Sequence, residues 1–268
     1  MSKEKVISRE YKIMLKKELF TGDERQLLKA TSTFWYTFRQ AINKIVIDVN
    51  GDLEKIAGER IIKFYDTDKH LLYRNYYILR DRYNTDTNER ELTFKFRHPD
   101  RYISQCCDIR TSVSDKEKTK FEEDIKPPFL GLYSFSNTQI ISPTENLRKL
   151  QDVARLYPNL PDKLTFYAEE EMKIVGVTVR ELLFVGAKFQ IRKTPKIDSE
   201  CALIVWYNNN SDEGKPVAVE FSFRYKDENE DYTRNMALRA YDAFQALQEK
   251  LTFWVDPESK TKTAYIYS

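Results

Sequence analysis

Hydrophobic and polar side chains alternate with period two through residues 76–98, in two runs joined by the polar segment 84–89. Because successive side chains of a β-strand point to opposite sides, this pattern predicts a hairpin with two different faces. One face is apolar, and the other carries the charged side chains of Arg80, Arg82, Glu91, Lys95 and Arg97. These charges must lie in water or meet an anion.

The rest of the chain predicts both strands and helices. Strands are expected at residues 6–15, 60–67, 120–125, 181–192, 202–207 and 216–226, with a closing edge strand in the tail 263–268. Helical spacing of apolar residues predicts helices over 27–46 and 233–251, and a capping box at 142–145 predicts a third helix to residue 157. The first helix should begin after Thr21 or Asp23 and end near Asn50. We interpret 101–118 as a surface loop, and 161–178 shows no clear pattern.

Composition restricts the class of protein. With 268 residues the chain can bury one large core, and we expect a single domain over residues 1–268. The 44 Lys and Arg nearly balance the 42 Asp and Glu, which argues against a general nucleic-acid or membrane-surface binder. The N-terminus lacks the apolar region of a signal peptide, so we expect a cytoplasmic protein. Three cysteines form neither a disulfide framework nor a C-x-x-C metal pair.

Strands with one apolar and one charged face allow two architectures. In a sandwich, the apolar faces meet and the charged faces are ordinary solvent surface. In a closed barrel, helices cover the apolar exterior and the charged faces line a wet tunnel. Arg and Lys on neighbouring strands of such a tunnel repel one another unless an anion neutralises them. The barrel therefore predicts a phosphate-rich ligand.

Several segments of the chain together resemble the CYTH superfamily, also called triphosphate tunnel metalloenzymes. They are Tyr65-Asp66-Thr67, Leu71/Leu72, Leu79-Arg80-x-Arg82 and Glu91-Leu92-Thr93-x-Lys95. The superfamily includes class IV adenylyl cyclases, thiamine triphosphatases and inorganic triphosphatases. The resemblance implies an α+β fold, with a closed eight-stranded antiparallel β-barrel whose polar lumen is flanked by helices. Such a tunnel binds a triphosphate through Arg and Lys, and divalent ions through Glu.

The sequence departs from the family where the metal would bind. The family has E-x-E-x-K on the first strand, and the matching residues here are Ser8, Glu10 and Lys12; a later E-x-E pair appears as Glu220 and Ser222. Mg²⁺ and Mn²⁺ prefer hard oxygen ligands. We therefore expect one Mg²⁺ or Mn²⁺ rather than two, on Glu10 and Glu220 with help from Asp124 or Glu122.

Two functions follow from the resemblance. The first is a divalent-metal-dependent phosphohydrolase, a triphosphatase rather than a cyclase, in which Glu91 or Glu122 orients the attacking water. The phosphates of the substrate would contact Lys12, Arg80, Arg82, Lys95, Arg97, Lys188, Arg192 and Arg224. The alternative is a non-catalytic binding protein for a polyphosphate, a nucleotide or another phosphorylated small molecule, because two carboxylates are missing while the cations remain. A protein-interaction module is a third reading, favoured if Arg80 and Lys95 face open solvent.

Overall fold

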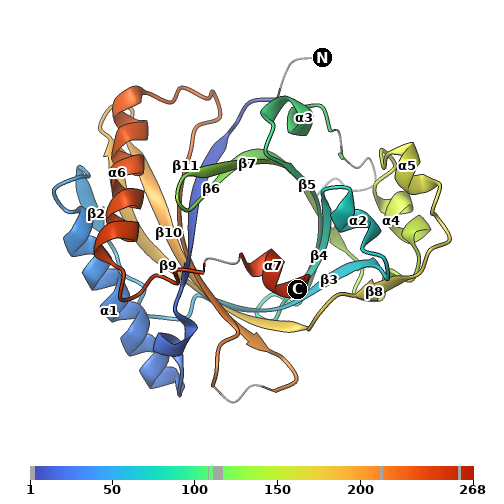
Figure 1. The fold of residues 1–268 in the computed structure, drawn as a ribbon, viewed down its shortest axis with the longest axis horizontal. Coiled ribbons are helices and arrows are strands. Elements are labelled where there is room, and N and C mark those ends of the chain that lie inside the picture. The colour runs from blue at the N-terminus through green and yellow to red at the C-terminus, as the bar shows by residue number, and fades with distance from the viewer. Residues whose placement is uncertain (1–3, 108, 111–116, 212–213, 259–260) are drawn as a thin grey trace.

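A closed ring of β-strands forms the centre of the molecule in the computed structural model, which describes residues 4–107, 109–110, 117–211, 214–258 and 261–268 (Figure 1). Within these residues the ring has nine strands: β1 (Ser8–Leu15), β3 (Gly58–Thr67), β4 (Tyr77–Asn84), β5 (Glu89–His98), β6 (Lys118–Lys126), β7 (Leu130–Ile141), β9 (Val179–Arg192), β10 (Ile197–Asn208) and β11 (Ala218–Lys226). They pair in the order β9-β10-β11-β1-β6-β7-β5-β4-β3, and β3 closes the ring by pairing with β9.

Shorter elements surround this barrel. The strands β2 (Asp48–Asn50) and β8 (Met172–Ile174) extend it beside β9 and β3. The described helices are η1 (Lys17–Phe20), α1 (Glu24–Ile42), α2 (Leu71–Arg74), α3 (Arg101–Gln105), α4 (Leu150–Leu156), α5 (Asp162–Thr165), α6 (Arg234–Lys250) and α7 (Lys262–Ile266). None of the helices in this part of the chain is long and apolar enough to cross a membrane.

The alternation along the strands places their apolar side chains outside the ring. The faces of β1, β9, β10 and β11 pack against α1 and α6, as Figure 1 shows, and form one hydrophobic core with Phe34, Phe38 and Phe244. A second core includes Leu92 and Phe94 of β5 with Leu150 and Val153 of α4. Burial of such side chains contributes about 1.5–3 kcal/mol each. The expected closed barrel with an apolar exterior under helices is therefore confirmed.

The barrel differs from the expected eight antiparallel strands. One pair, β1 with β6, is parallel, with Ser8 opposite Glu122. The extra strand, β7, was not predicted because its buried positions include the polar residues Ser134, Ser136, Asn137 and Gln139 rather than an apolar row. Tertiary partners stabilise these polar groups; the amide of Gln139, for example, donates to the carbonyl of Leu156.

Three predicted helix or strand boundaries were wrong. Asp23 caps α1 in a capping box as expected, but the helix ends at Ile42, and the backbone of Ile47 then donates to Gln190 on β9. The capping box predicted at 142–145 is instead a turn after β7, whose carbonyls accept from Arg90, and the helix begins at Leu150. The tail is the helix α7 rather than a strand.

The less regular segments also differ from expectation. The segment 101–118, expected as a loop, contains α3 and the start of β6, and its residues 108 and 111–116 lie outside the described part of the chain. The unassigned segment 161–178 holds α5 and β8.

Candidate functional site

A cavity of about 700 Å³ lies inside the barrel. Its described lining includes eleven Lys and Arg and only six Asp and Glu side chains, a net of five positive charges, whereas the whole chain has a net charge of +2. The positive charge of this protein is therefore concentrated in its lumen. Walls of low dielectric constant strengthen the field of such a cluster.

One side of the cavity is formed by the β4–β5 hairpin, and we call its cations, Arg80, Arg82 and Lys95, the cationic wall. They alternate with the outward Leu79, Leu92 and Phe94, as the sequence pattern predicts. On the neighbouring strand β7, Ser136 lies opposite Lys95.

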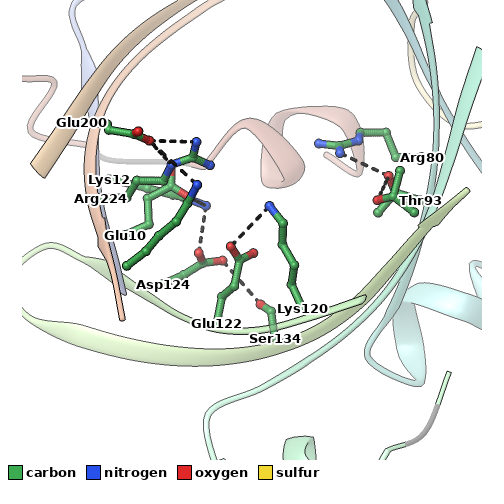
Figure 2. Close-up of polar contacts among 12 residues, drawn as sticks. Glu10, Lys12, Arg80, Thr93, Lys120, Glu122, Asp124, Ser134, Glu200 and Arg224 are labelled. Carbon is green, nitrogen blue, oxygen red and sulfur yellow. Dashed lines mark hydrogen bonds and ion pairs between the residues drawn. The ribbon is translucent and has the colours of Figure 1, made fainter. Parts of the chain in front are cut away.

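Arg80 has one side-chain hydrogen bond and no ion pair among the described residues. Its terminal nitrogen donates to the Thr93 hydroxyl at 3.3 Å, on the side of the barrel opposite Lys12 in Figure 2, and its buried Nε has no hydrogen-bond partner among the described residues. Burial and the neighbouring Arg82 lower the pKa of Arg80 to about 9. A lowered pKa in a base shows that its surroundings disfavour the charge.

The other two members of the wall are also poorly compensated. Lys95 has no ion pair with any described residue, and burial together with the charges of Arg97 and Lys12 lowers its pKa to about 8 despite the attraction of Asp124. Arg82 contacts Glu91 at 3.3 Å, while its buried Nε has no partner among the described residues. The cationic wall thus presents N–H donors and positive charge that an anion would satisfy.

The opposite side is formed by β1, β6 and β11, and we call its residues Glu10, Lys12, Asp124 and Glu220 the paired wall. Lys12 lies 3.0 Å from Glu10 and 2.9 Å from Asp124. Burial alone would raise the pKa of Asp124, but Lys12, Lys95 and Arg97 outweigh burial and hold it well below its usual range. Figure 2 shows Glu10, Lys12 and Asp124 pointing into the lumen toward one another.

Glu220 completes the paired wall. Its Oε1 lies 3.0 Å from the Nζ of Lys262, which reaches the lumen from α7. Each carboxylate of the paired wall therefore has an ammonium or guanidinium partner from the chain itself.

Most of the sequence-predicted site residues line this one cavity: Glu10, Lys12, Arg80, Arg82, Lys95, Arg97, Glu122, Asp124, Lys188, Glu220 and Arg224. Two do not. Arg192 is directed to the carbonyls of Thr194 and Asp231 on the outside, because it lies at the end of β9 beyond the lumen. Glu91 faces Arg82 near the end of the hairpin and is not part of the lining. Both side chains therefore lie outside the described lining of the cavity.

Six charged residues of the described lining were not among the predicted site residues: Arg60, Lys120, Lys126, Glu181, Glu200 and Lys262. Arg60 of β3 contacts Glu181 of β9 at 3.1 Å, and these strands meet only where the barrel closes. Lys262 reaches the lumen from a tail that the sequence pattern predicted to be a strand. The alternation along β9 places Glu181 on the same face as Leu183, but no local signal indicates its partner.

The paired wall does not fit the expected Mg²⁺ or Mn²⁺ site. A divalent ion binds carboxylate oxygens, so these oxygens must first separate from any ammonium or guanidinium group that they contact. Placing one on Glu10 and Glu220 would displace Lys12 and Lys262 and leave two ammonium groups beside a doubly charged ion at low dielectric constant. Among the residues the structure describes, no group of three or more His, Cys, Asp or Glu is arranged to hold a metal.

Comparisons with known proteins gave solved structures but no sequence relatives. No protein-family model and no curated protein matches the chain. A proposed adenylyl cyclase from Hippeastrum with a dominant triphosphatase activity is similar over 97% of this chain and 95% of its own, with 12% identity and a TM-score of 0.48. A proposed adenylate cyclase from Bacillus halodurans is similar over the full length of both chains, with 14% identity and a TM-score of 0.39. A third, from Vibrio parahaemolyticus, has 10% identity and a TM-score of 0.37, with 99% of this chain and 100% of its own covered.

Proposed function

We propose that the barrel binds a phosphorylated small molecule through a chain of two or three phosphate groups inside the cavity. The observation that carries this proposal is the net charge of the lining, five positive charges in about 700 Å³. Repulsion between the cations of Arg80, Arg82 and Lys95 is relieved when a polyanion enters.

Phosphate groups suit the donors that the cavity offers. Guanidinium groups such as those of Arg80 and Arg82 match the oxygens of a phosphate in pairs, and a lysine such as Lys95 acts as a point charge. The cations lie on a hairpin, so they are spaced along the lumen in strand register, with Arg80 opposite Thr93 and Ile78 opposite Lys95. A linear chain of phosphates can contact all of them at once.

Isothermal titration calorimetry with inorganic triphosphate tests this proposal. The intact protein should bind one triphosphate in the micromolar range or tighter, and orthophosphate more weakly by about tenfold or more, because orthophosphate can contact fewer cations. The variant Arg80→Gln should weaken triphosphate binding, whereas Arg39→Gln, which changes an exposed arginine on α1, should not. Equal affinity of the two variants for triphosphate would contradict the proposal.

Hydrolysis of a phosphoanhydride is a second candidate function, and Glu122 favours it. This buried carboxylate lines the cavity and has a loose ion pair, its Oε1 3.7 Å from the Nζ of Lys120. It is therefore the lining carboxylate best able to accept a hydrogen bond from an attacking water. Release of orthophosphate from triphosphate that is abolished in Glu122→Gln, with calorimetric affinity retained, would support hydrolysis. If the wild-type protein binds triphosphate without releasing orthophosphate, the protein is a binding protein without hydrolytic activity.

A further inference from the structure

The C-terminal segment is part of the cavity wall. In Figure 1 the helix α7 lies within the outline of the ring, and Thr261, Lys262 and Thr263 line the cavity. The segment is anchored by buried Ile266, which packs in an apolar cluster with Ile62 and Trp206.

Aromatic and backbone contacts fix the segment further. The ring of Tyr267 stacks on Tyr73 with centroids 4.2 Å apart, and the hydroxyl of Thr261 accepts from the backbone of Ala264 at the start of the helix. This packing holds Lys262 in place beside the lumen.

Lys262 is the cation that this segment brings into the lumen. Its Nζ lies 3.0 Å from Glu220 and 5.1 Å from the centroid of the Trp206 ring, and its side chain is 15% exposed. The charge also acts on Glu181: burial alone would raise the pKa of Glu181, but Lys262 with Arg82 and Arg60 lowers it to about 2. A single ammonium group therefore stabilises two buried carboxylates.

Glu220 is one of the two carboxylates on which a divalent ion was expected. Such an ion would rest on Glu220 and face the bound phosphates, so it would need Glu220 to lose Lys262. The anchored helix works against that exchange, because the packing of Ile266 and Tyr267 holds the start of α7, and Lys262 with it, beside Glu220.

We propose that Lys262 replaces the divalent cation of this cavity, so that the protein binds its polyphosphate ligand without a metal. The inference rests on the proposed function and specifies how the ligand's charge is neutralised: by the cationic wall on one side and by an ammonium group of the chain on the other. Removal of the Lys262 ammonium group would leave the Glu220 carboxylate without its cation, and a divalent metal ion could then bind there.

Two measurements on the full chain test this proposal. The first is the electron paramagnetic resonance of Mn²⁺ mixed with the protein, with and without triphosphate. With the wild-type protein, the Mn²⁺ signal should remain that of the free ion or of the ion bound to triphosphate. With Lys262→Gln, the signal should show Mn²⁺ bound to the protein.

The second measurement is calorimetry with triphosphate in EDTA. Lys262→Gln should lose about tenfold in affinity, as expected for one charge-assisted interaction.

Matched variants control for folding and for general charge. Lys262→Arg keeps a cation and should behave as wild type, and Lys44→Gln, which changes an exposed lysine, should change neither measurement. If Lys262→Gln does not give a cooperative melting transition, Mn²⁺ binding and triphosphate binding in EDTA by the wild-type protein decide the proposal.

The outcomes separate the two proposals. Stoichiometric Mn²⁺ binding by wild type, or triphosphate binding that disappears in EDTA, would overturn metal independence and leave the phosphate-binding function standing. No triphosphate binding under either condition would overturn the function itself, and this inference with it.

Discussion

The two sides of the lumen differ in whether their buried charges are compensated by groups of the chain itself. On the paired wall, Glu10, Asp124 and Glu220 each contact a cation of the chain at about 3 Å. On the cationic wall, Arg80 and Lys95 have no carboxylate partner among the described residues, and burial lowers the pKa values of both. A protein does not gain stability from uncompensated buried charge. The difference supports our proposal that the cationic wall receives the ligand.

The largest expected effect comes from removing the uncompensated charges together. The double variant Arg80→Gln/Lys95→Gln should weaken triphosphate binding by about 100-fold, because each charged hydrogen bond contributes roughly 1.5 kcal/mol. Calorimetry in EDTA measures this change. A loss no greater than that of a double substitution of exposed residues, such as Arg39→Gln/Lys44→Gln, would show that the ligand binds elsewhere.

The cationic wall should also reduce stability in the absence of ligand. Lys95 has a pKa of about 8 in the folded protein, below the ordinary value of about 10.4 that the unfolded chain retains. The unfolded state therefore binds the proton more tightly, and the charged Lys95 destabilises the fold at pH 7. Lys95→Met should raise the melting temperature by roughly 3 °C while weakening triphosphate binding about tenfold.

A comparison by calorimetry and thermal melting decides this prediction. A lower melting temperature for Lys95→Met would mean that Lys95 already has a compensating partner, and the contrast between the two walls would fail at this residue.

The pH dependence of binding should follow the same lysine. Between pH 7 and 9 the unliganded protein loses the proton of Lys95, whereas a bound polyanion favours the charged form. Affinity should therefore fall as pH rises through 8, by about tenfold over this interval. The Lys95→Gln variant corrects for ionisation of triphosphate itself. Parallel profiles of wild type and variant would rule out Lys95 as the titrating group.

The smallest effect is expected on the paired wall. Glu10→Gln removes a negative charge but leaves Lys12 bonded to Asp124, so triphosphate affinity in EDTA should rise by about two- to threefold. A site that held its ligand through a metal on Glu10 would instead bind triphosphate much more tightly in Mg²⁺ than in EDTA. Such a gain in the wild type, absent from Glu10→Gln, would reverse the roles assigned to the two walls.

The cationic wall could be predicted from the sequence because it depends on local alternation. Leu92 and Phe94 alternate with Thr93 and Lys95, and a strand must place these two sets on opposite faces. Closure of the barrel placed the charged set inside, as expected from the resemblance.

The paired wall could be predicted only in part, because its partners come from distant segments. Lys12 meets Asp124 through the parallel pairing of β1 with β6, which no local pattern indicates. Lys262 meets Glu220 because the tail folds as a helix against buried Ile62 and Trp206. The expected metal site followed from the resemblance, and the pairing of Glu220 with Lys262 could not be seen in the sequence.

A crystal structure of the protein with inorganic triphosphate, grown in EDTA, tests the phosphate-binding cavity most directly. We predict phosphate oxygens within hydrogen-bonding distance of the guanidinium group of Arg80 and the Nζ of Lys95, with Lys262 still paired to Glu220. Triphosphate bound outside the barrel, or a lumen that remains free of it at saturating concentration, would contradict the assignment of the cationic wall as the ligand site.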